Sequence, residues 1–209
     1  YSRSIGINGT QQVPVRAGGR VTGRVGRFSL GALDIETGEE SVSHAAATNF
    51  SVVRVKRDIL RKSAVGLIAS NRSVSTRGPG SNQTFGVDAT LGFFTNLNLN
   101  TYWARTDTPG RTTGQDSYRA QLDYNADRYG VQAEHLKIGA NFNPEMGFVR
   151  RVNMRKSYVG GRFSPRTKHN RVVRKWYYIG AFTAIENMAG RLESRSVLGE
   201  FDVDFQNSD

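Results

Sequence analysis

The sequence predicts an all-β fold built from long antiparallel strands that follow one another along the chain. Residues 85–93 and 97–103 alternate apolar with polar or small side chains, the pattern of strands with one apolar face. With their flanks they are about ten residues long, the length that a tilted strand needs to cross a bilayer. Connections alternate short and long, as when turns and loops lie on opposite sides of a membrane. Together these observations predict an antiparallel up-and-down transmembrane β-barrel of the outer-membrane type.

Composition narrows the choice of class. The 209 residues have a mean hydropathy of −0.50, and no apolar run reaches the roughly eighteen residues of a membrane-spanning helix. Alternation hides lipid-facing residues from such an average, so a membrane barrel is still compatible. The net charge of +11 would suit a nucleic-acid partner, but charges in turns, loops and a watery lumen explain it more simply, and we expect no nucleic acid. Cysteine is absent, so disulfides supply no clue to the compartment.

Taken in order, the chain predicts an irregular lead-in over residues 1–18 and then about eleven strands. A slip in the alternation near Gly31 predicts a β-bulge there. The strands are expected at 19–24, 27–36, 49–56, 64–72, 85–93, 97–103, 118–124, 129–135, 159–163, 176–182 and 201–205. The longest connection is expected at 137–155, a turn is expected at 164–170, and a further connection is expected at 185–195.

Residues 1–209 are expected to form a single β-barrel domain. Bacterial single-chain barrels close with an even number of strands, and an open sheet edge cannot face lipid. Because the expected count is odd, and because Tyr1 opens as if in mid-protein, we expect a portion of a longer barrel and of a longer chain.

Two sets of residues follow from the alternation. Outward aromatic residues at strand ends predict a girdle at the headgroup level of a membrane: Phe93, Trp103, Tyr118, Tyr124, Tyr129 and Trp176. Polar residues on the opposite face predict a lumen lining: Arg54, Lys56, Asp88, Asn98, Asn100, Arg119, Asp123, Glu134, Arg162, Lys175, Asp202 and Asp204. The basic members could favour anionic solutes, or pairing with the acidic members could cancel much of that field.

The connection NFNPEMGFVRR, residues 141–151, is unusually apolar for a loop because it carries Phe142, Met146 and Phe148. Three interpretations stay open: a constriction folded into the lumen, a cap at the mouth that binds a partner, and a packed external loop.

No catalytic, cofactor or metal site is expected. His44, His135 and His169 lack the spacing of metal ligands. A hydrolase would need carboxylates such as Asp88 and Glu134 at a set separation, and inward acids in a water-filled lumen are the commoner explanation. Glycine-rich stretches lack the Gly-Lys-Ser/Thr signature and the strand-to-helix context of a phosphate-binding loop.

Several segments resemble a family of uncharacterised bacterial envelope proteins. Its members join an N-terminal domain like carbohydrate-binding family nine to a C-terminal barrel domain of unknown function. The similar segments are YSRSIGI, GRVGRFSLGALDIETGEE, NFSVVRVKRDILRKSAVGLIASNR, GVDATLGFF, ARTDTPG and NFNPEMGFVRR. The resemblance implies the outer membrane of a diderm bacterium as location, and this chain resembles part of the barrel domain. It implies no catalytic residues, and sugar binding does not transfer because the carbohydrate-binding part is absent here.

We therefore expect a passive porin-like or transport-associated barrel that performs no chemistry. Its partners would be outer-membrane lipid, other envelope proteins or the family's N-terminal domain. One alternative is a structural or docking barrel that anchors a carbohydrate-binding-like domain or an envelope complex. A third is a soluble basic β domain that binds nucleic acid or an acidic polymer.

Overall fold

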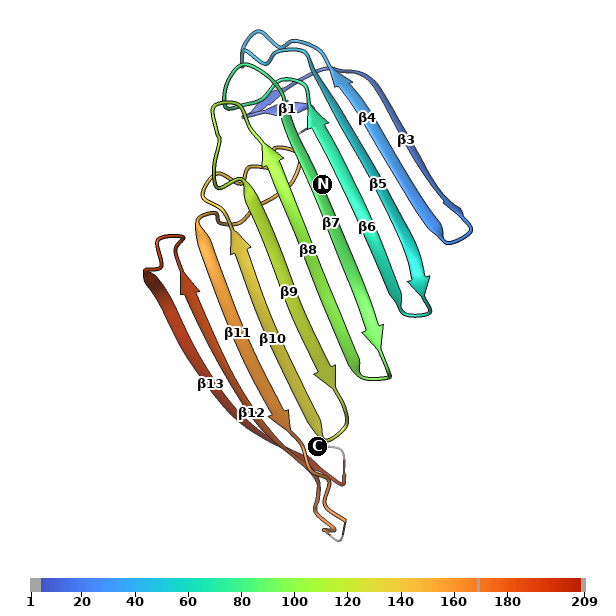
Figure 1. The fold of residues 1–209 in the computed structure, drawn as a ribbon, viewed down its shortest axis with the longest axis vertical. Helices are drawn as coiled ribbons and strands as arrows, with labels where there is room; N and C mark the ends of the chain where they lie inside the picture. Colours follow the sequence, from blue (N-terminus) through green and yellow to red (C-terminus); the bar gives the residue numbers. More distant parts are fainter. Residues whose placement is uncertain (1–4, 169, 208–209) are drawn as a thin grey trace.

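The computed structural model of the protein describes residues 5–168 and 170–207, and these residues form β-structure (Figure 1). Two short strands, β1 (Ile7–Asn8) and β2 (Gln11–Gln12), pair with each other. Eleven strands form one antiparallel sheet in chain order: β3 (Val15–Val25), β4 (Phe28–Thr37), β5 (Thr48–Leu60), β6 (Ser63–Arg72), β7 (Asn82–Phe93), β8 (Leu97–Asp107), β9 (Asp116–Asn125), β10 (Tyr129–Ile138), β11 (Met154–Phe163), β12 (Val173–Glu186) and β13 (Leu192–Phe205).

The all-β antiparallel up-and-down meander that the sequence predicts is confirmed, as is the number of long strands within the described residues. There the sheet is open, since β3 and β13 each pair on one side alone. Residues 1–4 of the expected lead-in lie outside the described residues. No helix in 5–168 or 170–207 is long and apolar enough to cross a membrane.

The connections define two ends of the sheet. The long-loop end carries residues 38–47, 73–81, 108–115, 139–153 and 187–191, and the short-turn end carries 26–27, 61–62, 94–96, 126–128 and 164–172. The predicted rhythm fails at the last two connections, because 164–172 is longer than the 187–191 loop opposite it. Strands β12 and β13 extend for 14 residues each and take up the chain that was expected to form a longer loop.

The bulge expected near Gly31 is absent from the described sheet. Pairing runs without a break from Thr22 opposite Gly31 to Gly18 opposite Ile35. Leu33 and Ile35 instead lie on the polar side of the sheet, directly opposite Val52 and Phe50 of β5. The apolar residues of β4 therefore change sides without a bulge, because these four residues form a small apolar cluster on the polar side near the long-loop end.

Neighbouring strands are staggered along their length, as Figure 1 shows. A row of directly opposed residues shows how far: Arg24, Ser29, Lys56, Gly66, Asp88, Tyr102, Arg119, Leu136, Lys156, Ile185 and Ser194. The row starts one residue from the short-turn end of β3 and finishes two residues from the long-loop end of β13. Over ten steps from strand to strand, the row shifts by about ten residues along the strands. Each step therefore combines a shift of roughly 3.3 Å along the strand with a spacing of about 4.8 Å between strands, which corresponds to a strand tilt of about 35°.

The register separates the side chains of the sheet into two faces. The apolar face carries the rows that include Val21, Leu67 and Phe201, and the polar face carries the rows that include Arg54 and Glu134. Side chains of the apolar face are widely exposed: Val21 by 73%, Leu67 by 50% and Phe201 by 54%. No described element covers this face, because the sheet is a single layer.

Candidate functional site

The polar face gathers the residues that the sequence assigned to a lumen. Direct pairing relates Asn98 to Asp123 and Lys175 to Asp204, and the other ladders extend the same face across the sheet. All twelve predicted residues lie on this face: Arg54, Lys56, Asp88, Asn98, Asn100, Arg119, Asp123, Glu134, Arg162, Lys175, Asp202 and Asp204. The structure brings them together; whether they line a water-filled pore stays a prediction.

Ion pairs cross the middle of the polar face. Arg54 forms a two-bond pair with Asp88, in which Nη2 donates to Oδ1 at 2.8 Å and Nη1 donates to Oδ2. Gly66 lies between the two strands, and a Cβ there would meet the Arg54 guanidinium at 2.6 Å and the Asp88 carboxylate at 2.9 Å. The glycine therefore leaves the space through which Arg54 reaches Asp88.

A second network lies on β9, β10 and β11. Glu134 accepts hydrogen bonds from Arg119 Nε at 2.7 Å and from Lys156 Nζ at 2.9 Å. Gln121 donates to Asp123 Oδ2 at 2.8 Å and accepts from Arg119. These contacts cancel much of the local charge, so the middle of the polar face carries no continuous basic stripe.

Asp127 organises the short-turn end of the polar face. Its carboxylate accepts from Arg166 Nε at 2.8 Å and from Lys175 Nζ at 2.9 Å. Hydrogen bonds from Arg166, then from Lys175, hold the pKa of Asp127 far below its ordinary value of 3.8. Arg162 donates nearby to Asn125 Oδ1 at 2.8 Å. Since Asp127 is in the turn 126–128, this cluster joins the β9–β10 turn to β11 and β12.

The β10–β11 loop folds across the polar face rather than away from it. Asn143 N donates to Thr106 Oγ1 at 3.2 Å, and Asn82 Nδ2 donates to the Asn143 carbonyl at 2.9 Å. Glu145 N donates to Asn82 Oδ1 at 3.2 Å. Asn82 is on β7 and Thr106 on β8, and both lie on the polar face. The loop thus reaches past β9 to the long-loop ends of β8 and β7.

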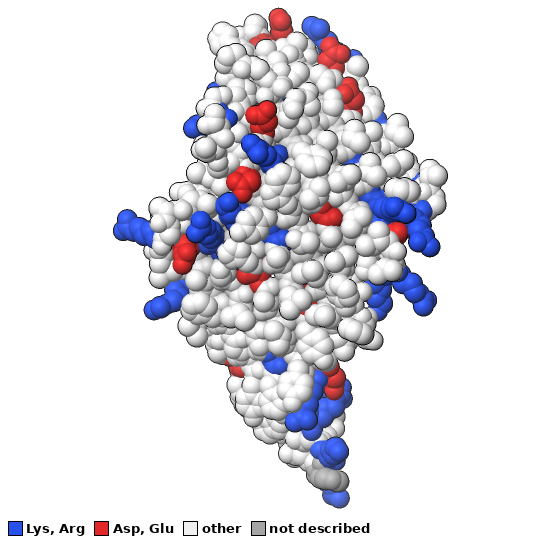
Figure 2. All heavy atoms as spheres, viewed as in Figure 1, with Lys and Arg blue, Asp and Glu red and all other residues white. Residues whose placement is uncertain are grey.

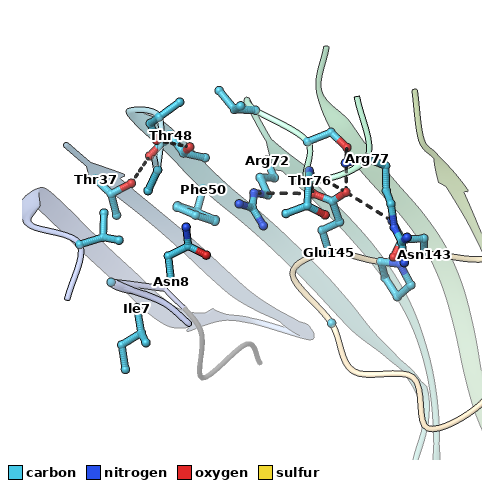
Figure 3. A pocket seen from close by; sticks show the side chains of 18 of the residues that line it. Ile7, Asn8, Thr37, Thr48, Phe50, Arg72, Thr76, Arg77, Asn143 and Glu145 are labelled. Atoms are coloured by element: carbon cyan, nitrogen blue, oxygen red, sulfur yellow. Dashed lines mark hydrogen bonds and ion pairs between the residues drawn. The ribbon is translucent and has the colours of Figure 1, made fainter. Parts of the chain in front are cut away.

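Glu145 fastens the far end of this loop. Its side chain is 3% exposed, and it accepts from Ser75 Oγ at 2.7 Å and from Thr76 N at 3.0 Å. It also pairs with Arg72 of β6, with 3.6 Å between Nε and Oε2. Figure 3 shows Glu145 extending from the loop toward Arg72, with Thr76 and Asn143 beside it. The carboxylate therefore ties the β10–β11 loop to the β6–β7 loop.

A cavity of about 930 Å³ adjoins this contact at the long-loop end. Its lining comes from the segment around the β1–β2 hairpin, from the β4–β5 loop with the adjoining ends of β4 and β5, from the β6–β7 loop with the end of β6, and from the β10–β11 loop. Phe50 lies on one side beneath the Arg72 guanidinium, whose carbon is 5.3 Å from the ring centre. Figure 3 shows Asn8 directed toward Phe50, on the far side of the cavity from the Glu145 contact, and Ile7 directed the other way.

The three loop residues singled out from the sequence divide between two environments. Phe142 and Met146 are buried, and Phe148 is 83% exposed and lines the cavity. The polar contacts of the loop go to the polar face of the sheet, and the three interpretations of the loop stay predictions. Glu145, Arg72 and Asn82, which hold the loop, were not predicted from the sequence. Glu145 is 73 positions from Arg72 and 63 from Asn82, and the meander brings the three together.

The six predicted girdle residues all lie on the apolar face. Aromatic rings gather near the short-turn end, where Tyr129 stacks on Phe163 at 5.4 Å, and Phe163 stacks on Tyr178 at 6.2 Å. Trp103 and Tyr118 lie toward the long-loop end and are directly opposed. Above them, the same face becomes polar: Asp34, Asn49, Ser51, Asn71, Gln83, Arg105, Asp107, Asp116, Lys137 and Arg155.

The remaining candidates have ordinary surroundings. His135 lies on the apolar face with Nδ1 3.0 Å from Ser157 Oγ, and His44, in the β4–β5 loop, lines the cavity. His169 lies outside the described residues. No group of three or more potential metal ligands is found among the residues that the structure describes.

Comparison with known proteins gives no match: no family model, no curated sequence and no solved structure is significantly similar to this chain. The resemblance of its segments to the envelope family therefore stays a prediction.

Proposed function

We propose that this chain forms part of the wall of an outer-membrane β-barrel that passes small polar solutes through a water-filled lumen. The observation that carries the proposal is the uncovered apolar face, which runs across the whole sheet opposite a polar face. Soluble monomers rarely expose apolar patches larger than a few hundred Å². A lipid bilayer would cover the apolar face, and water in the lumen would hydrate the polar one.

The dimensions of the apolar face support the same proposal. On β7 the apolar row runs from Phe85 to Phe93, a rise of about 26 Å along the strand. With a tilt of about 35°, that row would span roughly 22 Å along the membrane normal, close to the ~25 Å apolar band of known barrels. Aromatic residues at both borders fit the headgroup levels.

The closure of the barrel is part of the proposal. Stagger of about one residue per strand is the geometry that lets a tilted sheet close on itself. The eleven described strands leave β3 and β13 parallel to each other, since both run from the long-loop end to the short-turn end. Further strands would complete an antiparallel barrel and remove both lipid-facing edges.

In this setting the β10–β11 loop would narrow the lumen at the long-loop end. Its contacts with Asn82, Thr106 and Arg72 hold it over the polar face, where it can restrict solutes by size. The ion pairs on the polar face, which balance much of the basic charge, predict weak rather than strong anion preference.

A second candidate, a docking barrel with a sealed lumen, draws support from the same loop. Phe142 and Met146 are buried where the loop crosses the mouth, so the passage could be closed to solutes. The barrel would then serve as an anchor for another domain or envelope protein at the cavity beside Glu145.

Brominated lipids test the membrane proposal through the two tryptophans, Trp103 and Trp176, which both lie on the apolar face. We expect bromine in the acyl chains to quench both, measured singly in Trp176→Phe and Trp103→Phe variants in vesicles. Planar-bilayer conductance then separates the two candidates: steady conductance supports a pore, and a silent, lipid-inserted protein supports a docking barrel. Absence of quenching at both positions would contradict the membrane assignment itself.

A further inference from the structure

The short-turn end carries a group of basic side chains that the proposed solute pathway does not use. They come from four connections at this end and from the adjoining end of β5, and we call them the basic rim: Arg27, Arg57, Arg61, Lys62, Arg128 and Arg171. Figure 2 shows Lys and Arg side chains projecting at the right margin and at the lower tip of the molecule. In Figure 1 those places hold the β3–β4 and β5–β6 turns and the β11–β12 connection.

Nearby carboxylates do not neutralise the basic rim. Asp58 pairs with Arg24 at 2.6 Å, and Asp204 pairs with Arg174 at 3.1 Å. Asp127 is occupied by Arg166 and Lys175. Within the described residues, no ion pair joins a member of the basic rim to an acid. Its charge is therefore available to an anionic partner.

Two members of the rim lie at the border of the apolar face. The Arg57 guanidinium carbon is 5.2 Å from the centre of the Phe28 ring, and Arg57 is directly opposite Phe28 in the sheet. The Arg128 guanidinium carbon is 5.5 Å from the Tyr129 ring and 5.3 Å from the Phe163 ring. Cation–π contacts hold both cations against the aromatic rings that end the apolar rows.

This position selects the class of partner. A cation next to a wide apolar surface can bind an anion whose apolar tail covers that surface, and a lipid phosphate is such a group. A nucleic acid or an acidic peptide would leave the adjoining apolar rows without a cover. Along the strands, the cation is followed by an aromatic ring and then by the apolar row. In a bilayer, the headgroup phosphate is followed by the interface and then by the acyl chains, in the same order.

We infer that the basic rim binds the phosphate groups of anionic phospholipids in the leaflet at the short-turn end. This inference rests on the proposed membrane location, and it adds a lipid preference to it. Arg57 and Arg128 would contact the phosphate of a lipid whose acyl chains cover the apolar face. The turn residues Arg27, Arg61, Lys62 and Arg171 would add electrostatic attraction to the anionic membrane surface. Each Lys or Arg near an anionic membrane surface strengthens binding to that surface by roughly fivefold.

Trp176 is placed to report on this leaflet. Its ring stacks on Phe201 at 5.7 Å, Phe201 contacts Tyr178 at 5.2 Å, and Tyr178 stacks on Phe163, over which Arg128 lies. In a Trp103→Phe background, quenching of Trp176 by brominated phosphatidylglycerol is compared with quenching by brominated phosphatidylcholine in mixed vesicles. We expect the anionic lipid to quench more strongly, and salt to reduce the difference because it screens the rim.

Arg128→Gln should reduce the preference for phosphatidylglycerol about fivefold, and the double variant with Arg57→Gln should abolish it. Arg155→Gln is the matched control, because it removes one charge from the same face at the long-loop end and should leave the Trp176 preference unchanged. Equal quenching by both lipids, unaltered in Arg128→Gln, would overturn the inference and leave the membrane location standing. Absence of quenching by either lipid would overturn both.

Discussion

Arg54 and Asp88 form an ion pair across the bare backbone of Gly66, on three neighbouring strands of the polar face. The pair is about one-third exposed on each side, so water and salt screen it, and its value lies in where it places charge rather than in stability. If the polar face lines a lumen, this pair sets the charge at mid-height, where solutes pass.

Gly66→Ala should separate Arg54 from Asp88, because the added methyl would occupy the space of the guanidinium. We expect nearly unchanged folding, since both side chains are flexible at their ends, and a shift in the anion-to-cation permeability ratio of a few-fold. Gly31→Ala is the control: Gly31 is directly opposite Arg54, but its nearest neighbours would be 3.9 Å away. Reversal potentials in salt gradients that are identical for both variants would contradict this role of the pair.

Glu145→Ala should release the β10–β11 loop from the polar face. The substitution leaves Arg72 without its carboxylate and removes the acceptor for Ser75 and Thr76. A lost buried charge partner costs about 3 kcal/mol, and the loop should then become accessible to protease and the single-channel conductance should rise. Glu145→Gln keeps the size and one acceptor, so its cost should be about half as large.

Glu193→Gln offers a comparison at the other side of the same loop, where Arg151 pairs with Glu193. The two side chains are 46% and 30% exposed, so solvent screens the pair and its loss should change stability by less than about 1 kcal/mol. Equal protease sensitivity in Glu145→Ala and Glu193→Gln would show that Glu145 does not hold the loop.

Asp127 should make stability depend on pH at the acid end. Its folded pKa is depressed, so its contribution is fully present above the ordinary pKa of 3.8 and is lost as pH falls through that value toward the folded pKa. The Asp127 side chain is 59% exposed, so solvent limits the size of the effect. The melting temperature of the native protein should exceed that of Asp127→Asn at pH 6, and the difference should shrink steadily as pH falls below 3.8. A difference in melting temperature that does not change with pH would contradict this role of Asp127.

The pattern of side chains was enough to predict the faces of the sheet, because a strand alternates its side chains whatever lies beyond it. Each of the residues from Arg54 to Asp204 assigned to one face by alternation shares that face in the register. Alternation misled at Leu33 and Ile35, where apolar residues on the polar face pair with Val52 and Phe50. A sequence cannot show that exception, because it depends on which strand lies alongside.

The loop contacts were beyond prediction for a related reason. Asn82 and Asn143 are 61 positions apart, and they meet because the loop turns inward across two strands. The composition of 141–151 indicated an unusual loop, but the deciding residue, Glu145, resembles any exposed glutamate in the sequence. Its burial arises from Ser75, Thr76 and Arg72, which another loop and strand supply.

A pair of arginine substitutions on β7 tests which face meets lipid. Ala89 lies on the apolar face, midway between Phe85 and Phe93, and Thr90 lies next to it on the polar face. In a bilayer, Ala89→Arg should lower the free energy of unfolding by about 2–4 kcal/mol, because the charge would sit near the membrane midplane. Thr90→Arg should cost less than about 1 kcal/mol, since its side chain would enter water. Denaturant unfolding from vesicles measures both, and equal small costs would mean that Ala89 is surrounded by water.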